Sequence, residues 1–92
     1  MANAIVTIKI MPESPDIDLA KVEAAAKEKI ASFAGEGETK TEIKPVAFGL
    51  KELNIIFVVD EQKGSPDPLA DEIKSLEGVT SAEVVDVRRA VG

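Results

Sequence analysis

Residues 51–61 of this 92-residue chain, KELNIIFVVDE, constrain the fold more than any other segment. Apolar side chains alternate along this segment, as they do along a β-strand. One face of such a strand would carry Leu53, Ile55, Phe57 and Val59, and the other Ile56 and Val58. A strand that is apolar on both sides belongs in the interior of a sheet. We therefore expect residues 51–61 to form a central strand.

Three further segments have the composition of strands. Residues 4–11 are rich in β-branched side chains, and Pro12 ends the run. One face of this strand would carry Val6, Ile8 and Ile10. Residues 39–47 contain Pro45, which has no N–H group to donate to a neighbouring strand, so this segment should lie at an edge of the sheet. Residues 79–91 form the last such segment.

A first helix is predicted by apolar residues that recur at spacings of three and four. These residues are Leu19, Val22, Ala26, Ile30 and Phe33. Asp16 or Asp18 can accept hydrogen bonds from the N–H groups that open the helix. Gly35 follows the last apolar residue and can end the helix, because glycine adopts a positive φ at no steric cost.

A second, shorter helix is predicted after a run of turn residues, EQKGSPDP. Asp67 would be its N-cap and Pro68 its first helical residue, where a missing N–H group is harmless. The buried stripe of this helix would consist of Leu69, Ile73 and Leu76. Gly78 would end the helix.

The predicted order is β-α-β-β-α-β, and residues 1–92 form one domain without a linker or an internal repeat. Right-handed crossovers and one hairpin lead from this order to an α+β, ferredoxin-like fold. In that fold two helices pack on one face of a four-stranded antiparallel sheet, with the first and third strands central. The other face would carry Ile5, Ile56 and Val58. It could serve binding or dimerisation, but exposed aliphatic residues are common, and we prefer that simpler interpretation.

The composition excludes several classes of function. Eleven basic and 17 acidic residues give a net charge of −6, and only 3% of residues are aromatic, which argues against nucleic-acid binding. The chain contains no Cys and no His, so disulfides, thiolate nucleophiles, imidazole bases and Cys/His zinc sites are impossible. The acidic clusters lack the spacing of a calcium loop, and we expect neither a metal site nor a cofactor. Without a long apolar run or an apparent signal peptide, we expect a cytoplasmic protein.

Residues 45–51, PVAFGLK, are not explained by secondary structure alone. Phe48 stands beside Gly49 between two predicted strands, so its ring should lie in a tight connection at one end of the sheet. The ring could fill a local gap in the core. It could equally insert into a pocket on another protein, as aromatic residues often do in small interfaces. The residues alone leave both interpretations open.

Residues 45–53, PVAFGLKEL, which lead into IIFVVDE, resemble a family pattern. The pattern is P-[VI]-x-[FY]-G-[IL]-K-K-L, followed by a strand that ends V-V-[ED]-[DE]. The family is the guanine-nucleotide exchange domain of translation elongation factor 1-beta, and its short archaeal form is the most similar. The resemblance extends over nearly the whole chain, although only residues 45–61 form a specific motif.

The resemblance implies a ferredoxin-like exchange factor that is not an enzyme. It would promote GDP release from the GTPase elongation factor 1-alpha by disturbing the magnesium and phosphate environment of the nucleotide. The ring of Phe48 would insert against the GTPase, and Gly49 and Lys51 would belong to the same contact. From the resemblance we expect a protein that uses no cofactor, contacts neither nucleic acid nor membrane directly, and needs no companion subunit.

Two departures from the family pattern affect the expected contacts. Glu52 replaces the second lysine of the K-K pair, so only Lys51 carries over. Eukaryotic members have a lysine near the C-terminus that reaches toward the magnesium site, whereas this chain has Arg88 and Arg89. These arginines could bind the partner in place of that lysine, or they could protect the edge strand from unwanted pairing. We favour edge protection for at least one of them.

Two other functions occur on the same fold class. A dimeric ferredoxin-like domain that senses a small molecule would need a Gly-rich loop after the first strand, where this chain has MPESP. An acylphosphatase-like enzyme would need an arginine in that loop, but arginines occur only at positions 88 and 89. The exchange factor is therefore the preferred function, with the sensing domain as the alternative.

Overall fold

The computed structural model describes residues 3–35 and 37–90 and has the predicted order of elements. The strands are β1 (Asn3–Pro12), β2 (Thr39–Pro45), β3 (Lys51–Asp60) and β4 (Val79–Ala90). The helices are α1 (Leu19–Ala34) and α2 (Asp67–Lys74), and two short 3-10 turns are η1 (Ala47–Gly49) and η2 (Glu61–Lys63). Residue 91, which the sequence includes in the last strand, lies outside the described residues.

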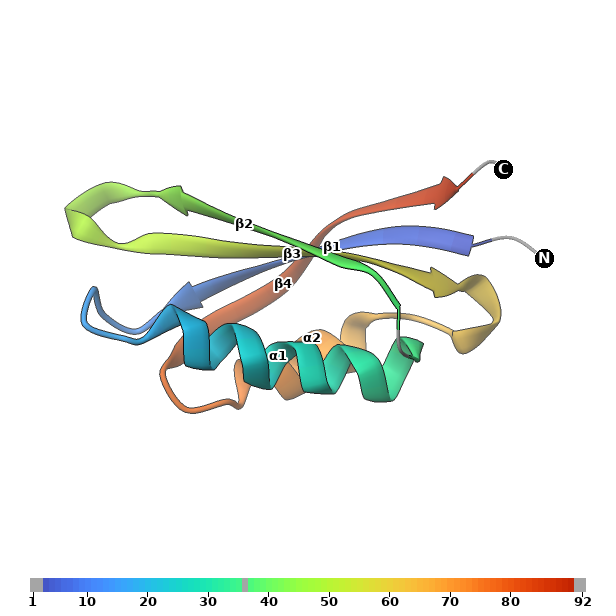
Figure 1. Ribbon diagram of the computed structural model, residues 1–92, viewed down its shortest axis with the longest axis horizontal. Coiled ribbons are helices and arrows are strands. Elements are labelled where there is room, and N and C mark those ends of the chain that lie inside the picture. Colours follow the sequence, from blue (N-terminus) through green and yellow to red (C-terminus); the bar gives the residue numbers. More distant parts are fainter. Residues whose placement is uncertain (1–2, 36, 91–92) are drawn as a thin grey trace.

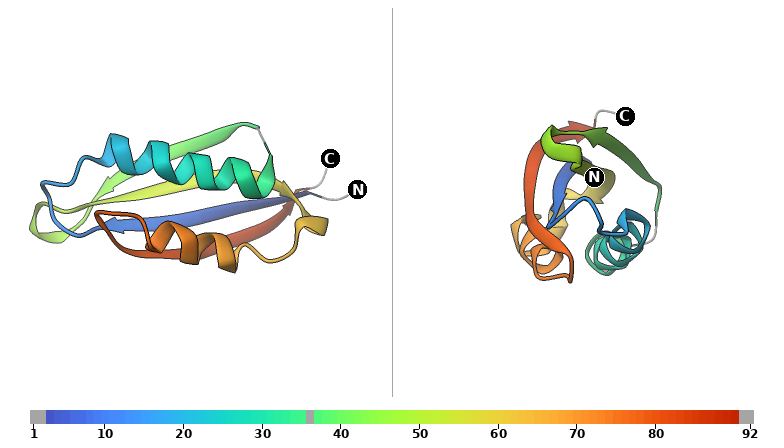
Figure 2. Two further views of the ribbon diagram at one scale, coloured as in Figure 1. Left: turned by 90° about the horizontal axis from the view of Figure 1, so that it is seen from below. Right: turned by 90° about the vertical axis from the view of Figure 1, so that its left-hand side faces the viewer.

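The four strands form one antiparallel sheet in the order β2-β3-β1-β4. Figure 2 shows α1 and α2 side by side on the same face of this sheet. The ferredoxin-like α+β fold is therefore confirmed, and so are the central positions of the first and third strands. The β2–β3 hairpin projects at one end of the molecule, and the start of β1 and the end of β4 meet at the other (Figure 1).

The core lies between the sheet and the helices, and the pairing of β1 with β3 forms its centre. The opposed pairs are Val6 with Phe57, Ile8 with Ile55 and Ile10 with Leu53, and all six side chains are almost fully buried. The helices add Val22, Ala26 and Ile30 from α1 and Leu69, Ala70 and Ile73 from α2. Each large aliphatic or aromatic side chain buried here contributes about 1.5–3 kcal/mol to folding. Most of the predicted apolar stripes are thus in the core, whereas Leu19, Phe33 and Leu76 are only partly buried, and Leu76 lies beyond the end of α2.

The ends of α1 follow the prediction, whereas those of α2 are displaced. Asp18 is the N-cap of α1 and accepts a hydrogen bond from the Ala20 N–H at 3.0 Å. In α2, Asp67 is already helical, because Pro66 takes an αR conformation and the Ser65 hydroxyl accepts from the Asp67 N–H at 3.1 Å. The prediction of Asp67 as N-cap was therefore wrong by one position.

The prediction that Gly78 ends α2 was also wrong, because the helix stops at Lys74. The Ser75 hydroxyl donates to the Glu72 carbonyl oxygen at 2.7 Å, and the Ser75 N–H also turns back to α2. The chain then reaches Gly78, whose φ of 86° starts the reversal into β4. Glycine is favoured there because this φ strains any other residue and an added Cβ would lie only 3.2 Å from side-chain atoms of Ile17.

The face of the sheet away from the helices is largely charged. Of the apolar residues expected there, Ile5 and Ile56 are half-buried and only Val58 is exposed, at 48%. Their neighbours include a Lys40–Glu42 ion pair and an Asp86–Arg88 ion pair. The face therefore carries a small apolar patch within ordinary charged surface. No helix of the described residues is long and apolar enough to cross a membrane.

We expect Phe57→Ala to lower the free energy of unfolding by about 3–5 kcal/mol, because it removes a buried ring from the centre of the core. Val58→Ala, at the next position of the same strand, should cost about 1 kcal/mol or less because that side chain is half exposed. Urea denaturation of both variants measures the difference. Equal losses of stability would contradict the difference in burial between Phe57 and Val58.

Candidate functional site

The connection between β2 and β3, residues 46–50, is here called the hairpin tip. The Val46 N–H donates to the Leu50 carbonyl oxygen at 2.8 Å, and the Leu50 N–H donates to the Ala47 carbonyl oxygen at 3.2 Å. Two successive residues between these bonds have left-handed backbone, Phe48 at φ 62° and Gly49 at φ 76°. Glycine takes this conformation readily, but for a residue with a side chain it costs about 1–2 kcal/mol. Phe48 is the one non-glycine residue with positive φ in the described part of the chain.

The strained backbone of the hairpin tip presents the Phe48 ring to solvent. The residue is 94% exposed, so the interpretation of Phe48 as a plug in the core is wrong. Folding of the described chain gains nothing from burying this ring, and the backbone that carries it is strained. Strain of this kind is maintained where a side chain has a role outside the core, and it makes the hairpin tip the candidate functional site.

The hairpin tip faces the loop between β1 and α1, residues 13–18. Gly49 lies close to Pro15. A Cβ added at Gly49 would be 3.8 Å from the Pro15 Cγ. The loop and the tip enclose a hollow of about 360 Å³, here called the tip hollow. Its lining residues are Pro12, Ser14, Pro15, Ile17, Asp18, Leu19, Gly49 and Lys51. Three of the sequence-predicted site residues, Phe48, Gly49 and Lys51, are thus together at this end of the molecule.

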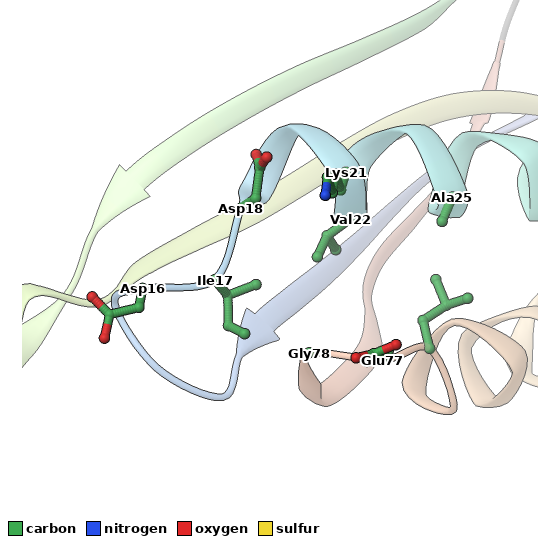
Figure 3. Close-up of a pocket in the computed structure, with 9 residues that line it drawn as sticks. Asp16, Ile17, Asp18, Lys21, Val22, Ala25, Glu77 and Gly78 are labelled. Carbon is green, nitrogen blue, oxygen red and sulfur yellow. The ribbon is translucent and has the colours of Figure 1, made fainter.

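A second hollow, a groove of about 490 Å³, lies between α1 and the turn that leads into β4. Figure 3 shows Ile17 of the preceding loop, together with Val22 and Ala25 of α1, on the side that faces Glu77 and Gly78. The groove is lined by apolar and charged side chains, and it contains none of the residues of the 45–53 motif. We therefore do not assign the candidate site to it.

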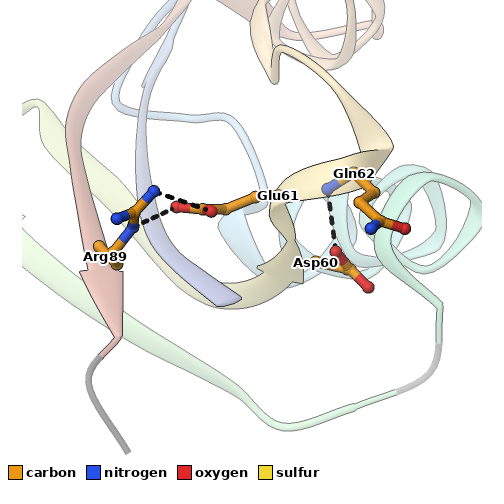
Figure 4. A network of polar contacts seen from close by, with 4 residues as sticks. All are labelled: Asp60, Glu61, Gln62 and Arg89. Atoms are coloured by element: carbon orange, nitrogen blue, oxygen red, sulfur yellow. Dashed lines mark hydrogen bonds and ion pairs between the residues drawn. The ribbon is translucent and has the colours of Figure 1, made fainter. Parts of the chain in front are cut away.

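Arg88 and Arg89 lie at the other end of the sheet. Figure 4 shows Arg89 of β4 turned toward Glu61 of η2. The Arg89 Nε and Nη2 donate to the two carboxylate oxygens of Glu61 at 2.9 and 3.2 Å. The hydrogen bond and charge of Glu61 raise the pKa of Arg89 above its ordinary value. The Arg88 Nε lies 2.9 Å from the Asp86 carboxylate, so both arginines are paired within the chain.

The predicted site residues therefore form two groups rather than one. Lys51 begins β3, and Asp60, at its other end, is opposite Asn3, which also pairs with Ala90 of β4. A ten-residue strand spans about 30 Å, and the molecule is 42 Å long. No single contact of ordinary size covers both ends. The topology predicted from sequence already implied this separation, but the Glu61–Arg89 pair had no signal in the sequence.

Comparison with known proteins identifies the family. Residues 5–90 match the model of the EF-1 guanine nucleotide exchange domain. The chain belongs to this family. Elongation factor 1-beta of Methanothermobacter thermautotrophicus is 39% identical over 97% of this chain and 98% of its own length. The proteins of the same name from Methanobrevibacter smithii and Staphylothermus marinus are 40% and 41% identical, with the same coverage. Guanine-nucleotide exchange in translation elongation is the function that this family membership gives the chain.

Solved structures resemble the chain in fold alone. A de novo designed protein, Foldit4, has a TM-score of 0.62 and 18% identity over 98% of both chains. The BlrP1 BLUF protein has a TM-score of 0.57 and 14% identity, covering this whole chain and 57% of its own. At 18% and 14% identity, these likenesses concern the fold and say nothing about the hairpin tip.

We expect Phe48→Asn to raise the free energy of unfolding by about 1 kcal/mol. Asparagine tolerates left-handed backbone better than phenylalanine does, and the exposed ring contributes no packing that the change would remove. Urea denaturation measures the gain, and the slope of the free energy of unfolding against urea concentration should stay unchanged. A loss of stability would show that the ring packs against the domain after all.

Proposed function

We propose that this chain promotes GDP release from the GTPase elongation factor 1-alpha, and that the Phe48 ring is its main contact with that partner. The observation that carries the proposal is the fully displayed ring on a left-handed backbone, in a chain of the exchange-domain family. A ring held outside the core can enter a pocket on another protein without any loss of packing at home. Aromatic side chains that become buried in an interface supply much of the binding free energy of small interfaces.

The exchange itself follows from linkage between two ligands of the GTPase. A factor that binds the nucleotide-free GTPase more tightly than the GDP-bound form must weaken GDP binding by the same ratio. This role requires no covalent step, so we propose that the chain is not an enzyme and uses no cofactor of its own. We further propose that it acts in the cytoplasm on the GDP-bound and nucleotide-free GTPase, without direct contact with nucleic acid.

Lys51 and Gly49 support Phe48 in this proposal in different ways. Gly49 continues the left-handed turn and leaves room for Pro15 beside it. Lys51 adds a positive charge at the foot of the tip. The arginines at the other end, Arg88 and Arg89, would form a second contact with the same partner, although each is paired with a carboxylate in the free chain.

We expect Phe48→Ala to raise the concentration for half-maximal acceleration of GDP release by about 30-fold, which corresponds to about 2 kcal/mol of lost binding. The assay follows a fluorescent GDP analogue leaving elongation factor 1-alpha in excess unlabelled nucleotide. Val85→Ala is the matched control, because Val85 is an exposed apolar residue in the middle of the edge strand β4, away from both proposed contacts. If the unaltered chain does not accelerate release, the proposal fails and the ligand-sensing alternative becomes the working hypothesis.

The role of Arg89 can be separated from that of its ion pair. If Arg89 contacts the partner, Arg89→Gln should slow exchange at least about threefold, whereas Glu61→Gln should leave it unchanged because the guanidinium is released and not removed. The same GDP-release assay measures both variants. Equal effects of the two changes would indicate that the pair only holds the end of β4.

A further inference from the structure

We infer that the tip hollow receives a glutamate or aspartate side chain of the same GTPase partner, whose carboxylate pairs with Lys51. The inference rests on the proposed function, because it adds a contact next to that of Phe48 at the same end of the molecule. It concerns the chemistry of the partner group that meets Lys51, which the motif does not specify. Four observations lead to it: the position of the hollow, its polar groups, its apolar walls and the position of a second lysine, Lys44, outside it.

The tip hollow is continuous with the surface that displays the ring. Gly49, the neighbour of Phe48 in the chain, lines the hollow, and so does Lys51 two residues later. A protein that closes around the Phe48 ring must therefore also cover the mouth of the hollow. An uncovered void of about 360 Å³ there would leave water against apolar walls within the interface, so a side chain of the partner is the expected occupant.

The polar groups of the hollow determine which side chain fits. The Asp18 Oδ1 accepts a hydrogen bond from the Ala20 N–H at 3.0 Å, so this carboxylate is directed at the N-terminus of α1, whose dipole offsets its charge. The Ser14 Oγ accepts from the Asp16 N–H at 3.3 Å. Lys51, in contrast, has no ion pair among residues 3–35 and 37–90. Its ammonium group offers three donors, and a carboxylate is the side-chain acceptor with which it forms the strongest hydrogen bonds.

The remaining walls favour a side chain over a small free anion. They consist of apolar residues, Pro12, Pro15, Ile17 and Leu19. Methylene groups of a glutamate or aspartate can pack against such walls while the carboxylate reaches the ammonium group at the rim. A hydrated inorganic anion would bring no apolar surface to cover them.

Lys44 provides an internal comparison with Lys51. It lies on β2 one residue before Pro45, is exposed, and likewise has no ion pair among the described residues. In the register of the hairpin Lys44 is opposite Glu52, whereas Lys51 is opposite Pro45. Adjacent positions of a strand pair point to opposite faces of the sheet. Lys44 therefore adds the same charge to the same end of the molecule without lining the hollow.

The first experiment compares these two lysines in the GDP-release assay. We expect Lys51→Gln to raise the half-maximal concentration about tenfold at low salt, with a smaller effect at high salt, because a charge-assisted contact is lost. Lys51→Arg should restore most of the affinity, and Lys44→Gln should change it less than twofold. Equal effects of Lys51→Gln and Lys44→Gln would overturn the inference, because they would indicate a general attraction of positive charge to the partner.

The second experiment blocks the hollow while it keeps Lys51. Ser14→Phe places a ring in the hollow and should weaken acceleration about tenfold or more, whereas Glu13→Phe, an exposed position on the same loop outside the lining, should not. Thermal unfolding checks that both variants are folded. Full activity of a folded Ser14→Phe variant would contradict the inference. A dimer that sedimentation detects in the unaltered chain, and that Ser14→Phe abolishes, would also contradict it by making a second copy the occupant.

The two proposals can fail separately. If the unaltered chain does not accelerate GDP release, the proposed function is wrong and the hollow has no assigned partner. If the unaltered chain is active and Phe48→Ala is impaired, but Lys51→Gln and Ser14→Phe act as the unaltered chain does, only the inference about the hollow is wrong.

Discussion

The antiparallel pairing of β1 with β3 is the interaction on which the rest of this structure depends. It sets Ile8 opposite Ile55 and Val6 opposite Phe57, and both helices pack over the face that these residues share. A shift of one residue would turn this apolar set toward solvent, so burial fixes the register. The same register determines where β3 begins and ends. It therefore places Lys51 and the hairpin tip at one end of the molecule and Asp60 at the other.

The strain at Phe48 is tolerated because this core supplies stability elsewhere. A left-handed phenylalanine costs about 1–2 kcal/mol, which is a noticeable share of the roughly 5–15 kcal/mol of net stability of a small domain. The β2–β3 register and the Val46–Leu50 hydrogen bond close the tip and hold Phe48 in this conformation. The backbone position of the ring is thus set before any partner arrives, so less backbone entropy is lost on binding.

The sequence sufficed for the fold because its apolar periodicities are unambiguous. Alternation along residues 51–61 corresponds to a buried face of β3, and the stripe from Leu19 to Phe33 is buried through its middle, so both elements are confirmed. The ends of α2 were less predictable, since Pro66 and Ser75 act through local backbone geometry that composition does not reveal. The exposure of Phe48 needed the structure as well, because an aromatic residue in a connection is compatible with burial and with display. The Glu61–Arg89 pair joins residues 28 positions apart, and no periodicity reports such a contact.

The two ends of the molecule hold their cations differently, and this difference bears on where binding begins. At the β4 end, Arg88 and Arg89 are paired with carboxylates of the chain itself, and a partner must replace those bonds to use either arginine. Exposed pairs contribute little stability, so the replacement is possible, but the gain in binding is correspondingly small. At the tip, Lys51 and the Phe48 ring have no such competitors among the described residues. New contacts there are made without breaking old ones, and the tip should therefore supply most of the binding free energy.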